Sequence, residues 1–403
     1  MATRERYMQD AKKRYDLVLM GASGFTGRLV AEHLHQRNPS LSWAIAGRNE
    51  EKLEAIRSEY APSAEIVIGD SLSKEDMRSL AASSKVVAST AGPFAKIGTP
   101  LVEACALTGT DYVDITGETQ WIRDIIDAYH EIAQENGARI INCCGFDSLP
   151  SDLGTYLLTD SLRMANSQLE CIGILTRLRG RLSGGTFASM QNLVKAAKVK
   201  EVARVLAHPF SLNPRPLPKL RKPSDQTGAI FLDDLNMWTT PFVMAGINTR
   251  IVRRSEALRG YEPTDLIYHE AVRARSRGKA VLTSTMLGLG LVSQFFGPTR
   301  ALSSLFLPKP GEGPTAEERQ NGSFTMELFG RKQGEATYAK KVKVHADSDP
   351  GYSATAKMLG ESALACLDVP RTQTGMLTPS VALGPHLIER LRAVGISFEL
   401  TSI

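Results

Sequence analysis

The chain has 403 residues, 42% of them hydrophobic and 23% charged, which is the composition of an ordinary globular protein long enough for two domains. Its formal net charge of +5 is small, and no basic stripe is interleaved with aromatic residues, so nucleic acid is not a predicted partner. Five cysteines without Cys-x-x-Cys spacing predict neither a disulfide framework nor a metal site, and they favour the cytoplasm. The first fourteen residues are charged and lack an apolar core, so we expect no signal peptide there.

Residues 15–49 have the order of a dinucleotide-binding βαβ unit. The apolar run 17–20 stops at a glycine, two more glycines follow at three-residue spacing, and a helical stretch leads to a second strand at 43–46. Glycines in this arrangement allow a tight turn and a close approach of the backbone to a pyrophosphate at a helix N-terminus. The residues predicted to bind the cofactor here are Gly21, Ser23, Gly24, Phe25, Thr26 and Gly27.

Arg48 stands at the end of the second strand, 21 residues after Gly27 (48 − 27), where NAD-binding folds usually carry Asp or Glu. A carboxylate there would repel a 2′-phosphate, whereas a guanidinium can hold it with paired, charge-assisted hydrogen bonds. Arg48 and the neighbouring Asn49 therefore predict NADP(H) as the cofactor. The alternative is a surface arginine that caps the next helix, although Asn49 is itself a good capping residue.

Residues 50–145 continue to alternate between strands and helices. The expected strands are 65–68, 85–89, 112–115 and 139–143, and helices are expected to begin near residues 50, 73, 99 and 121. This alternation predicts an α/β fold with a Rossmann-type, doubly wound parallel sheet. Ligands of such sheets bind at the carboxyl ends of the strands. The further cofactor-binding residues predicted at strand ends are Asp70, Thr90, Ala91, Gly92, Pro93 and Phe94.

Three carboxylates near the ends of later strands, Asp114, Glu118 and Asp147, are the candidate groups for proton transfer or for orienting a substrate. For each of them a structural role, such as a helix cap, is about as plausible as catalysis. The chain lacks the Tyr-x-x-x-Lys pair of short-chain reductases, a Gly-x-Ser-x-Gly elbow and a His-Glu-x-x-His site. Cys143 and Cys144 are expected to be buried packing residues rather than nucleophiles.

The pattern changes after residue 150. We expect a strand at 172–175, a helical stretch at 187–206, a proline-rich basic loop at 209–223 that is either a lid or a solvated loop, and strands near 323–329 and 336–344. Helices are expected at 352–367 and from 386 onward. The predicted domains are an NADP-binding Rossmann domain at 1–148, an α+β substrate or oligomerisation domain at 149–348, and C-terminal helices at 349–403.

Residues 280–299 form a run of twenty residues without a charge, preceded by Arg273, Arg275, Arg277 and Lys279. A membrane-spanning helix would be marginal, because polar residues interrupt the run. Three interpretations remain: a buried helix, a helix lying on a lipid surface with the basic residues at anionic head groups, or the wall of a hydrophobic substrate cavity.

Several of these motifs together resemble those of the saccharopine dehydrogenase-like oxidoreductases, and most of all the branch with the mycobacterial trans-acting enoyl reductases and the lipid-droplet-associated animal proteins. The resemblance implies a Rossmann domain, a second α+β domain and C-terminal helices that return to the first domain. Lys96-Ile97 stands where relatives commonly carry a tyrosine, which puts a tyrosine proton donor there in doubt. The motifs that carry the resemblance are 21–27, 46–48, 91–94, 111–118, 144–152, 183–186, 349–352 and 377–379.

This resemblance implies an NADPH-dependent reductase, and the apolar segment 280–299 suits an apolar acyl or polyketide-type substrate with a carbon–carbon double bond. One alternative is a saccharopine-type imine or amino-acid reductase. Another is a lipid-surface protein with vestigial nucleotide binding. Besides a small-molecule substrate, the partners considered are a second copy of the chain in a homodimer and a membrane or lipid droplet contacted through residues 273–299.

Overall fold

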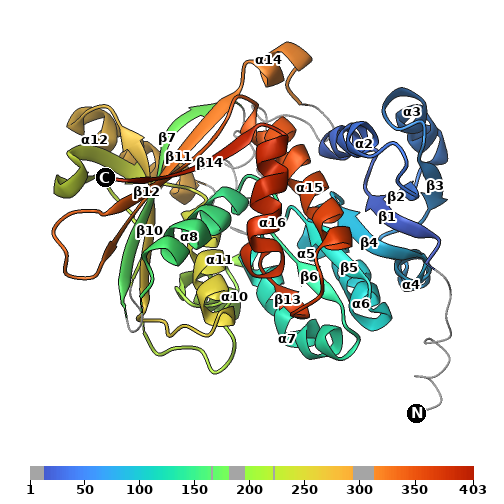
Figure 1. The fold of residues 1–403 in the computed structure, drawn as a ribbon, viewed down its shortest axis with the longest axis horizontal. Helices are drawn as coiled ribbons and strands as arrows, with labels where there is room; N and C mark the ends of the chain where they lie inside the picture. Colours follow the sequence, from blue (N-terminus) through green and yellow to red (C-terminus); the bar gives the residue numbers. More distant parts are fainter. Residues whose placement is uncertain (1–12, 165–166, 181–195, 221–222, 294–312) are drawn as a thin grey trace. The chain divides into compact units, whose positions relative to one another are not determined.

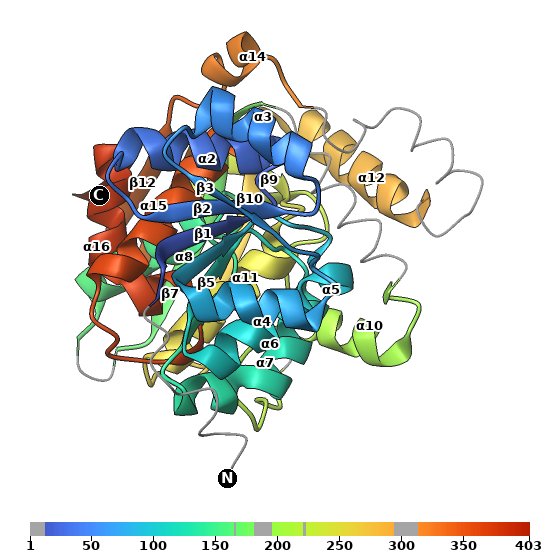
Figure 2. The ribbon, with the colours of Figure 1, turned by 90° about the vertical axis from the view of Figure 1, so that its right-hand side faces the viewer.

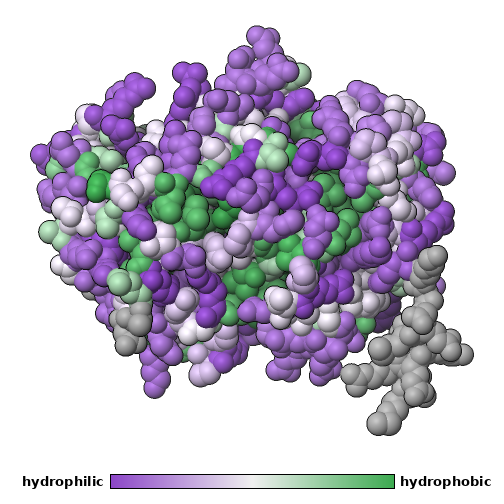
Figure 3. Space-filling model, in the orientation of Figure 1, coloured by the Kyte–Doolittle hydropathy of each residue, from purple (hydrophilic) through white to green (hydrophobic). Residues whose placement is uncertain are grey.

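The computed structural model describes residues 13–164, 167–180, 196–220, 223–293 and 313–403, and it divides into two compact units (Figure 1). Unit 1 is formed by Met1–Phe146 and Tyr352–Val394, and unit 2 by Asp147–Gly351 and Gly395–Ile403. On the face drawn in Figure 3, polar residues cover most of the surface of each unit, interrupted by smaller apolar patches.

Unit 1 is built on a seven-stranded sheet in the order β13-β6-β5-β4-β1-β2-β3, in which every pair of neighbours is parallel. The prediction of a doubly wound parallel sheet is therefore confirmed. Its strands are β1 (Tyr15–Met20), β2 (Trp43–Gly47), β3 (Glu65–Ile68), β4 (Ser84–Ser89), β5 (Asp111–Asp114), β6 (Arg139–Ile141) and β13 (Gly375–Leu377). The strand order reverses at β1, which lies between β4 and β2, so the carboxyl ends of β1 and β4 mark the point where such sheets bind ligands.

Helices cover both faces of this sheet, as Figure 2 shows. Helices α2, α3, α15 and α16 lie on one face, and α4, α6 and α7 pack together on the other. The return of C-terminal helices to the first unit is thereby confirmed for Tyr352–Val394, whereas Gly395–Ile403, predicted to belong with them, are part of unit 2. The helices of unit 1 are α2 (Phe25–Arg37), α3 (Glu50–Tyr60), α4 (Lys74–Ser83), α5 (Phe94–Ile97), α6 (Thr99–Thr108), α7 (Thr119–Glu135), α15 (Thr355–Asp368) and α16 (Pro379–Ala393).

Unit 2 contains a second seven-stranded sheet in the order β14-β12-β11-β7-β10-β9-β8, in which only the β10–β7 pair is parallel. The mixed sheet agrees with the predicted α+β character. Its strands are β7 (Leu169–Arg179), β8 (Ile230–Leu232), β9 (Met237–Pro241), β10 (Leu266–Ala274), β11 (Ser323–Lys332), β12 (Lys340–Ala346) and β14 (Ile396–Ser402). The helical elements are α8 (Leu149–Leu162), α10 (Lys200–Ala207), η1 (Asp233–Leu235), α11 (Ala245–Leu258), α12 (Arg277–Ser293), α14 (Ala316–Gln320) and η2 (Pro350–Ala354), which runs into unit 1.

The start of the proline-rich loop is held by buried arginines of α11. Arg253 donates to the carbonyl of Pro209 at 3.0 Å and Arg254 to the carbonyl of Leu212, while Arg250 donates to the carbonyl of Leu206 at the end of α10, just before the loop, at 3.0 Å. These bonds argue against a freely moving lid over the first part of the loop. Of the helical stretch expected at 187–206, residues 187–195 lie outside the described residues, and α10 occupies its end. The motif 183–186 and residues Arg221 and Lys222 also lie outside them.

Helix α12 is not the buried helix that was one interpretation of its sequence. Its large side chains are exposed, Leu282 by 63%, Met286 by 62% and Leu289 by 61%, whereas Ala280 is buried. The reason is that α12 lies at the edge of unit 2, where it contacts β9 and β10 (Figure 2). No helix in the described ranges is long and apolar enough to cross a membrane. Residues 294–299 of the apolar run lie outside those ranges.

Candidate active site

The glycines after β1 are required by backbone geometry. Gly21 has a φ of +88°, and a Cβ atom there would lie 2.8 Å from the amide nitrogen of Ala91. A Cβ atom on Gly27 would lie 2.2 Å from the carbonyl oxygen of Gly21. Side chains at either position would separate the start of α2 from the end of β1 and from the turn after β4. The predicted tight turn with a closely packed helix is what the structure shows.

The first turn of α2 offers backbone N–H groups to an anion. Its N-cap residue, Gly24, makes no side-chain cap, and the turn contains no acidic residue. These N–H groups and the positive end of the helix dipole suit a pyrophosphate. Ser23 is exposed and Thr26 half-buried, whereas the Phe25 ring is buried, with its centroid 4.7 Å from that of Tyr352. Phe25 therefore reaches a ligand through its backbone rather than its ring.

Arg48 is exposed immediately after β2 and makes no hydrogen bond or ion pair with the part of the chain that the structure describes. Asn49 caps α3, because its Oδ1 accepts a hydrogen bond from the Lys52 amide at 2.8 Å. Arg48 is therefore not needed as a cap. After β3, Asp70 shapes the next turn by accepting from the Leu72 amide at 3.0 Å. An uncommitted guanidinium at the end of β2 fits the 2′-phosphate of NADP(H).

We expect the Arg48→Asp variant to bind NADPH about tenfold to a hundredfold more weakly, because it loses charge-assisted hydrogen bonds and adds a repelling carboxylate. Its affinity for NADH should stay unchanged or rise. Titration of both nucleotides by fluorescence measures this, with Arg57→Asp, the same charge change on α3, as the control. Equal affinities of the native protein for NADPH and NADH would contradict the role of Arg48.

The turn after β4 lies against the turn after β1. The Thr90 hydroxyl donates to the carbonyl of Gly21 at 3.1 Å, and the Thr90 amide donates to the carbonyl of Met20 at 2.9 Å. The peptide bond between Gly92 and Pro93 is cis, and Phe94 then begins α5. The segment Thr90–Phe94 is thus held at the carboxyl end of the sheet, where the cofactor site was predicted.

Glu118 acts as a cap for α5. Its carboxylate accepts from the backbone amides of Phe94 at 2.9 Å and Ala95 at 3.1 Å, and the side chain is buried. A carboxylate with two backbone donors is suited to fixing the turn that contains Gly92 and Pro93. These contacts favour a positioning role for Glu118.

Asp114, at the end of β5, is fully buried and forms hydrogen bonds with the loops that follow β5 and β6. Its carboxylate accepts from the Tyr112 hydroxyl at 3.1 Å, from Asn142 Nδ2 at 2.8 Å, and from the amides of Thr116 and Cys143, each at 3.1 Å. Burial raises the pKa of Asp114 to about 6, against the opposing effect of these hydrogen bonds. Four donors leave little capacity for a substrate, so a positioning role is favoured here too.

Cys143 has a φ of +65°, which is uncommon for a residue other than glycine, and its bond to Asp114 holds it there. Cys143 and Cys144 are both buried, as expected for packing residues.

Asp147 differs from the other two candidates. It lies just before α8 and is partly buried, and its carboxylate has no hydrogen-bond or ion-pair partner within the described ranges. Burial raises the pKa of Asp147 to about 6. An unpartnered carboxyl group with a raised pKa is what a proton donor requires. Of the three predicted carboxylates, Asp147 is the one whose contacts leave it available for chemistry.

Comparisons with known proteins agree with this geometry. Residues 17–141 match the family model of the saccharopine dehydrogenase NADP-binding domain. The chain is 36% identical to a Mycobacterium tuberculosis protein whose name gives it provisionally as a trans-acting enoyl reductase, and 33% identical to the trans-acting enoyl reductase of Mycobacterium ulcerans. Each alignment covers 98% of this chain and 100% of the relative.

A solved structure, apo saccharopine dehydrogenase (L-Glu forming) from Saccharomyces cerevisiae, is similar with a TM-score of 0.54 at 11% identity, covering 96% of this chain and 100% of that one. At that identity, the likeness concerns the fold alone.

Proposed function

Because the chain belongs to the saccharopine dehydrogenase-like oxidoreductases, in the branch of the mycobacterial trans-acting enoyl reductases, and is therefore an NADP-dependent enzyme, we propose that it reduces a carbon–carbon double bond. The substrate class in this proposal is an apolar acyl or polyketide-type compound in which the double bond is conjugated to a carbonyl group. The enzyme would then belong to lipid metabolism. The names of relatives that align over nearly the whole chain support the reaction, and the availability of Asp147 is the structural observation that carries it.

The chemistry requires a hydride donor, which NADPH supplies when bound, and a proton donor. The hydride forms a bond to the β-carbon, the double bond is lost, and the resulting enolate takes a proton at the α-carbon. The first turn of α2 and Arg48 would bind the phosphates of NADP(H), while Glu118 and Asp114 fix the turns at the carboxyl end of the sheet. Asp147 gives the proton and regains one from solvent. The reduction adds one hydride, which the bound cofactor would supply, and one proton, which Asp147 would supply.

An assay with two classes of substrate tests this proposal. The purified protein is mixed with NADPH and a series of trans-2-enoyl thioesters of increasing chain length, and separately with saccharopine-type substrates, namely glutamate with an aldehyde. We expect NADPH oxidation with the thioesters only, faster for longer chains. Turnover of the glutamate mixture alone would instead establish the imine reductase alternative, and turnover of neither would refute both.

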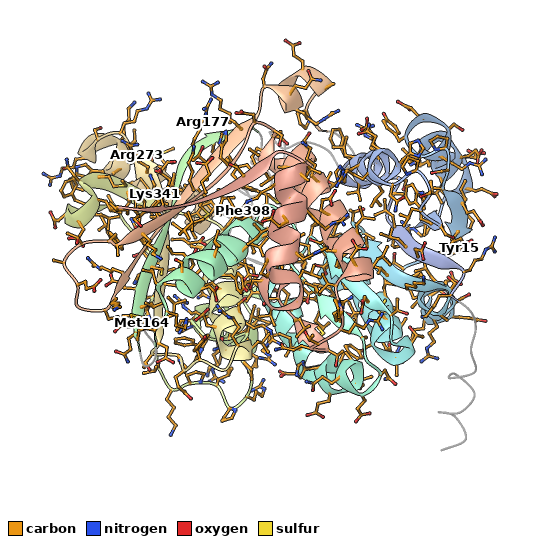
Figure 4. The ribbon with its side chains drawn as sticks, viewed as in Figure 1. Tyr15, Met164, Arg177, Arg273, Lys341 and Phe398 are labelled. Atoms are coloured by element: carbon orange, nitrogen blue, oxygen red, sulfur yellow. The ribbon has the colours of Figure 1, made fainter. Side chains whose placement is uncertain are left out.

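A second property is proposed from α12, namely peripheral contact between this protein and an anionic lipid surface in the cytoplasm. The exposed side chains of Leu282, Met286 and Leu289 recur at helical spacing. Four exposed basic residues precede or begin the helix, and residues 273–293 contain no acidic residue; Arg273 is labelled in Figure 4. An apolar helical face beside a basic cluster is the pattern of interfacial helices.

We expect the protein to float with vesicles that contain phosphatidylserine and less with purely zwitterionic vesicles. Replacing Arg273 and Arg275 by alanine should lower partitioning about thirtyfold, since each basic residue near the surface contributes about 1 kcal/mol. The Leu282→Glu, Met286→Glu double variant should lose partitioning, whereas Met164→Glu, a control at a side chain exposed by 64%, should not.

Absence of native vesicle binding would refute the lipid proposal. A second result would also refute it: the Leu282→Glu, Met286→Glu variant floats like the native protein but sediments as a monomer where the native protein sediments as a dimer. In that case α12 would be a surface between two copies of the chain.

A further inference from the structure

A chain of buried polar side chains runs through unit 2 to the residue that precedes α8. Ser148 is the N-cap residue of α8 but makes no side-chain cap; instead, its hydroxyl donates to Oδ1 of Asn248 at 2.9 Å. Nδ2 of Asn248 donates to Oε2 of Glu270 at 2.9 Å, and the Tyr268 hydroxyl donates to Oε1 of Glu270 at 2.7 Å. The chain thus links α8, α11 and β10.

All four of these side chains are buried, and Glu270 forms no ion pair with the residues that the structure describes. Its nearest polar neighbours are neutral, with Ser151 of α8 close to the amide of Asn248 at 3.4 Å. Strand β7 offers no side chain at this point, because a Cβ atom on Gly173 would lie 2.9 Å from the Tyr268 hydroxyl.

Two charged groups interact with Glu270 without forming a salt bridge to it. Arg253 of α11 is an opposite charge, but it donates its hydrogen bonds to the carbonyls of Tyr268 at 2.9 Å and Pro209 at 3.0 Å. Asp225 is a like charge and raises the pKa of Glu270. The main cause is burial, which raises the pKa of Glu270 to about 7. The carboxyl group is therefore neutral in mildly acidic solution and begins to ionise near neutrality.

Burying polar side chains costs desolvation, and apolar residues of similar volume often replace buried polar groups in proteins without loss of stability. Stability alone is therefore a weak explanation of this buried polar chain. The geometry suggests a reason, because the polar chain ends at Ser148 and Ser148 is the neighbour of Asp147. We propose that Glu270 is a positioning residue: through Asn248 and Ser148 its carboxyl group fixes the start of α8 and thereby the place of Asp147. The proposal rests on the proposed function only for the catalytic role of Asp147; the positioning itself is tested without any substrate.

Ionisation of Glu270 places a charge among neutral partners in the core, and the polar chain must loosen to solvate it. The first turn of α8 reports this directly, because the amide of Asp152 donates to the carbonyl of Ser148 at 2.9 Å. We expect hydrogen exchange in this turn, corrected for the intrinsic chemical rate, to be about tenfold faster at about pH 8.5 than at about pH 6.

Three variants of the full chain complete the experiment. Glu270→Gln keeps an acceptor for Asn248 but cannot ionise, so the pH dependence should vanish while exchange stays slow. Tyr268→Phe removes a donor to the carboxylate, which should shift the transition to higher pH. Glu389→Gln, which removes an exposed carboxyl group on α16 of unit 1, should leave exchange in α8 as in the native protein.

Exchange in the native α8 that does not change with pH, or a Glu270→Gln variant that keeps the native pH dependence, would overturn the proposal. If Glu270→Gln fails to fold, the Tyr268→Phe shift decides, and an unshifted transition in that variant would also overturn it. A protein that reduces no thioester but shows the expected exchange would refute the proposed reaction and leave the positioning role standing.

Discussion

Asp147→Asn is expected to lower kcat for thioester reduction about a hundredfold to ten-thousandfold, the range measured when a general acid is lost. The asparagine amide cannot deliver a proton to the enolate, whereas its size and place before α8 are nearly the same. The affinity for NADPH should not change, because Asp147 is not one of the predicted nucleotide-binding residues and asparagine alters neither the first turn of α2 nor Arg48. Steady-state kinetics together with NADPH titration measures both effects.

The pH profile provides the control for this prediction. A proton donor must be protonated, so the native kcat/KM should fall about tenfold per pH unit above the pKa of Asp147, which is about 6. The residual activity of Asp147→Asn should show no such fall. Asp160→Asn, which changes an exposed carboxylate on α8, should behave as the native enzyme. Native-like activity of Asp147→Asn would remove Asp147 from the mechanism.

Unit 1 was largely predictable from sequence because its strands are short buried apolar runs that end at glycines or polar residues. The missing strand, β13, has only three residues and comes from the C-terminal region, so no local pattern marks it. In unit 2, α8 and α11 were not predicted. Most residues of α8 are buried all round, which removes the helical period, and α11 buries arginines that usually indicate a solvated face.

The residues of the candidate site also fall into those that could be predicted from sequence and those that could not. The glycines after β1 were predictable, because their role is a backbone geometry that a short sequence encodes. The roles of the carboxylates were not, because they depend on partners distant in sequence: Glu118 caps a helix that begins 24 residues earlier. Glu270 was missed altogether, since only the fold brings β10 beside α11 and α8. The signal that could have drawn attention to it is a glutamate with Tyr268 and Val272 two residues away on either side, on the same face of a strand.

Glu361→Ala is expected to lower the free energy of unfolding of unit 1 by about 3 kcal/mol. This is the lower end of the range for breaking a buried ion pair, because Arg37 and Arg390 keep partial access to water. Glu361 is fully buried in α15. Its Oε1 accepts from Nε of Arg37 at 2.7 Å and contacts Nε2 of His33 at 3.0 Å, and its Oε2 accepts from Nε of Arg390 at 2.8 Å. It thereby joins α2, α15 and α16, and its loss leaves cationic groups facing one another.

The pKa of Glu361 gives this prediction a pH dependence. Burial by itself would raise this pKa, but the hydrogen bonds from His33 and Arg37 and the charge of Arg390 hold it below its usual value. A lowered pKa means that the contribution to stability is present above the pKa of the unfolded chain, about 4.3, and is lost as the pH falls through the folded value. The difference between native protein and variant should therefore shrink in acid.

Urea denaturation in a Trp238→Phe background measures this stability, because the two remaining tryptophans, Trp43 and Trp121, both belong to unit 1. The control is Glu389→Ala, which removes an exposed ion pair with Arg392 on α16 and should cost less than about 1 kcal/mol. If Glu361→Ala costs no more than Glu389→Ala at neutral pH, or if its cost grows in acid, then packing of apolar residues rather than this buried carboxylate holds the C-terminal helices on the nucleotide-binding unit.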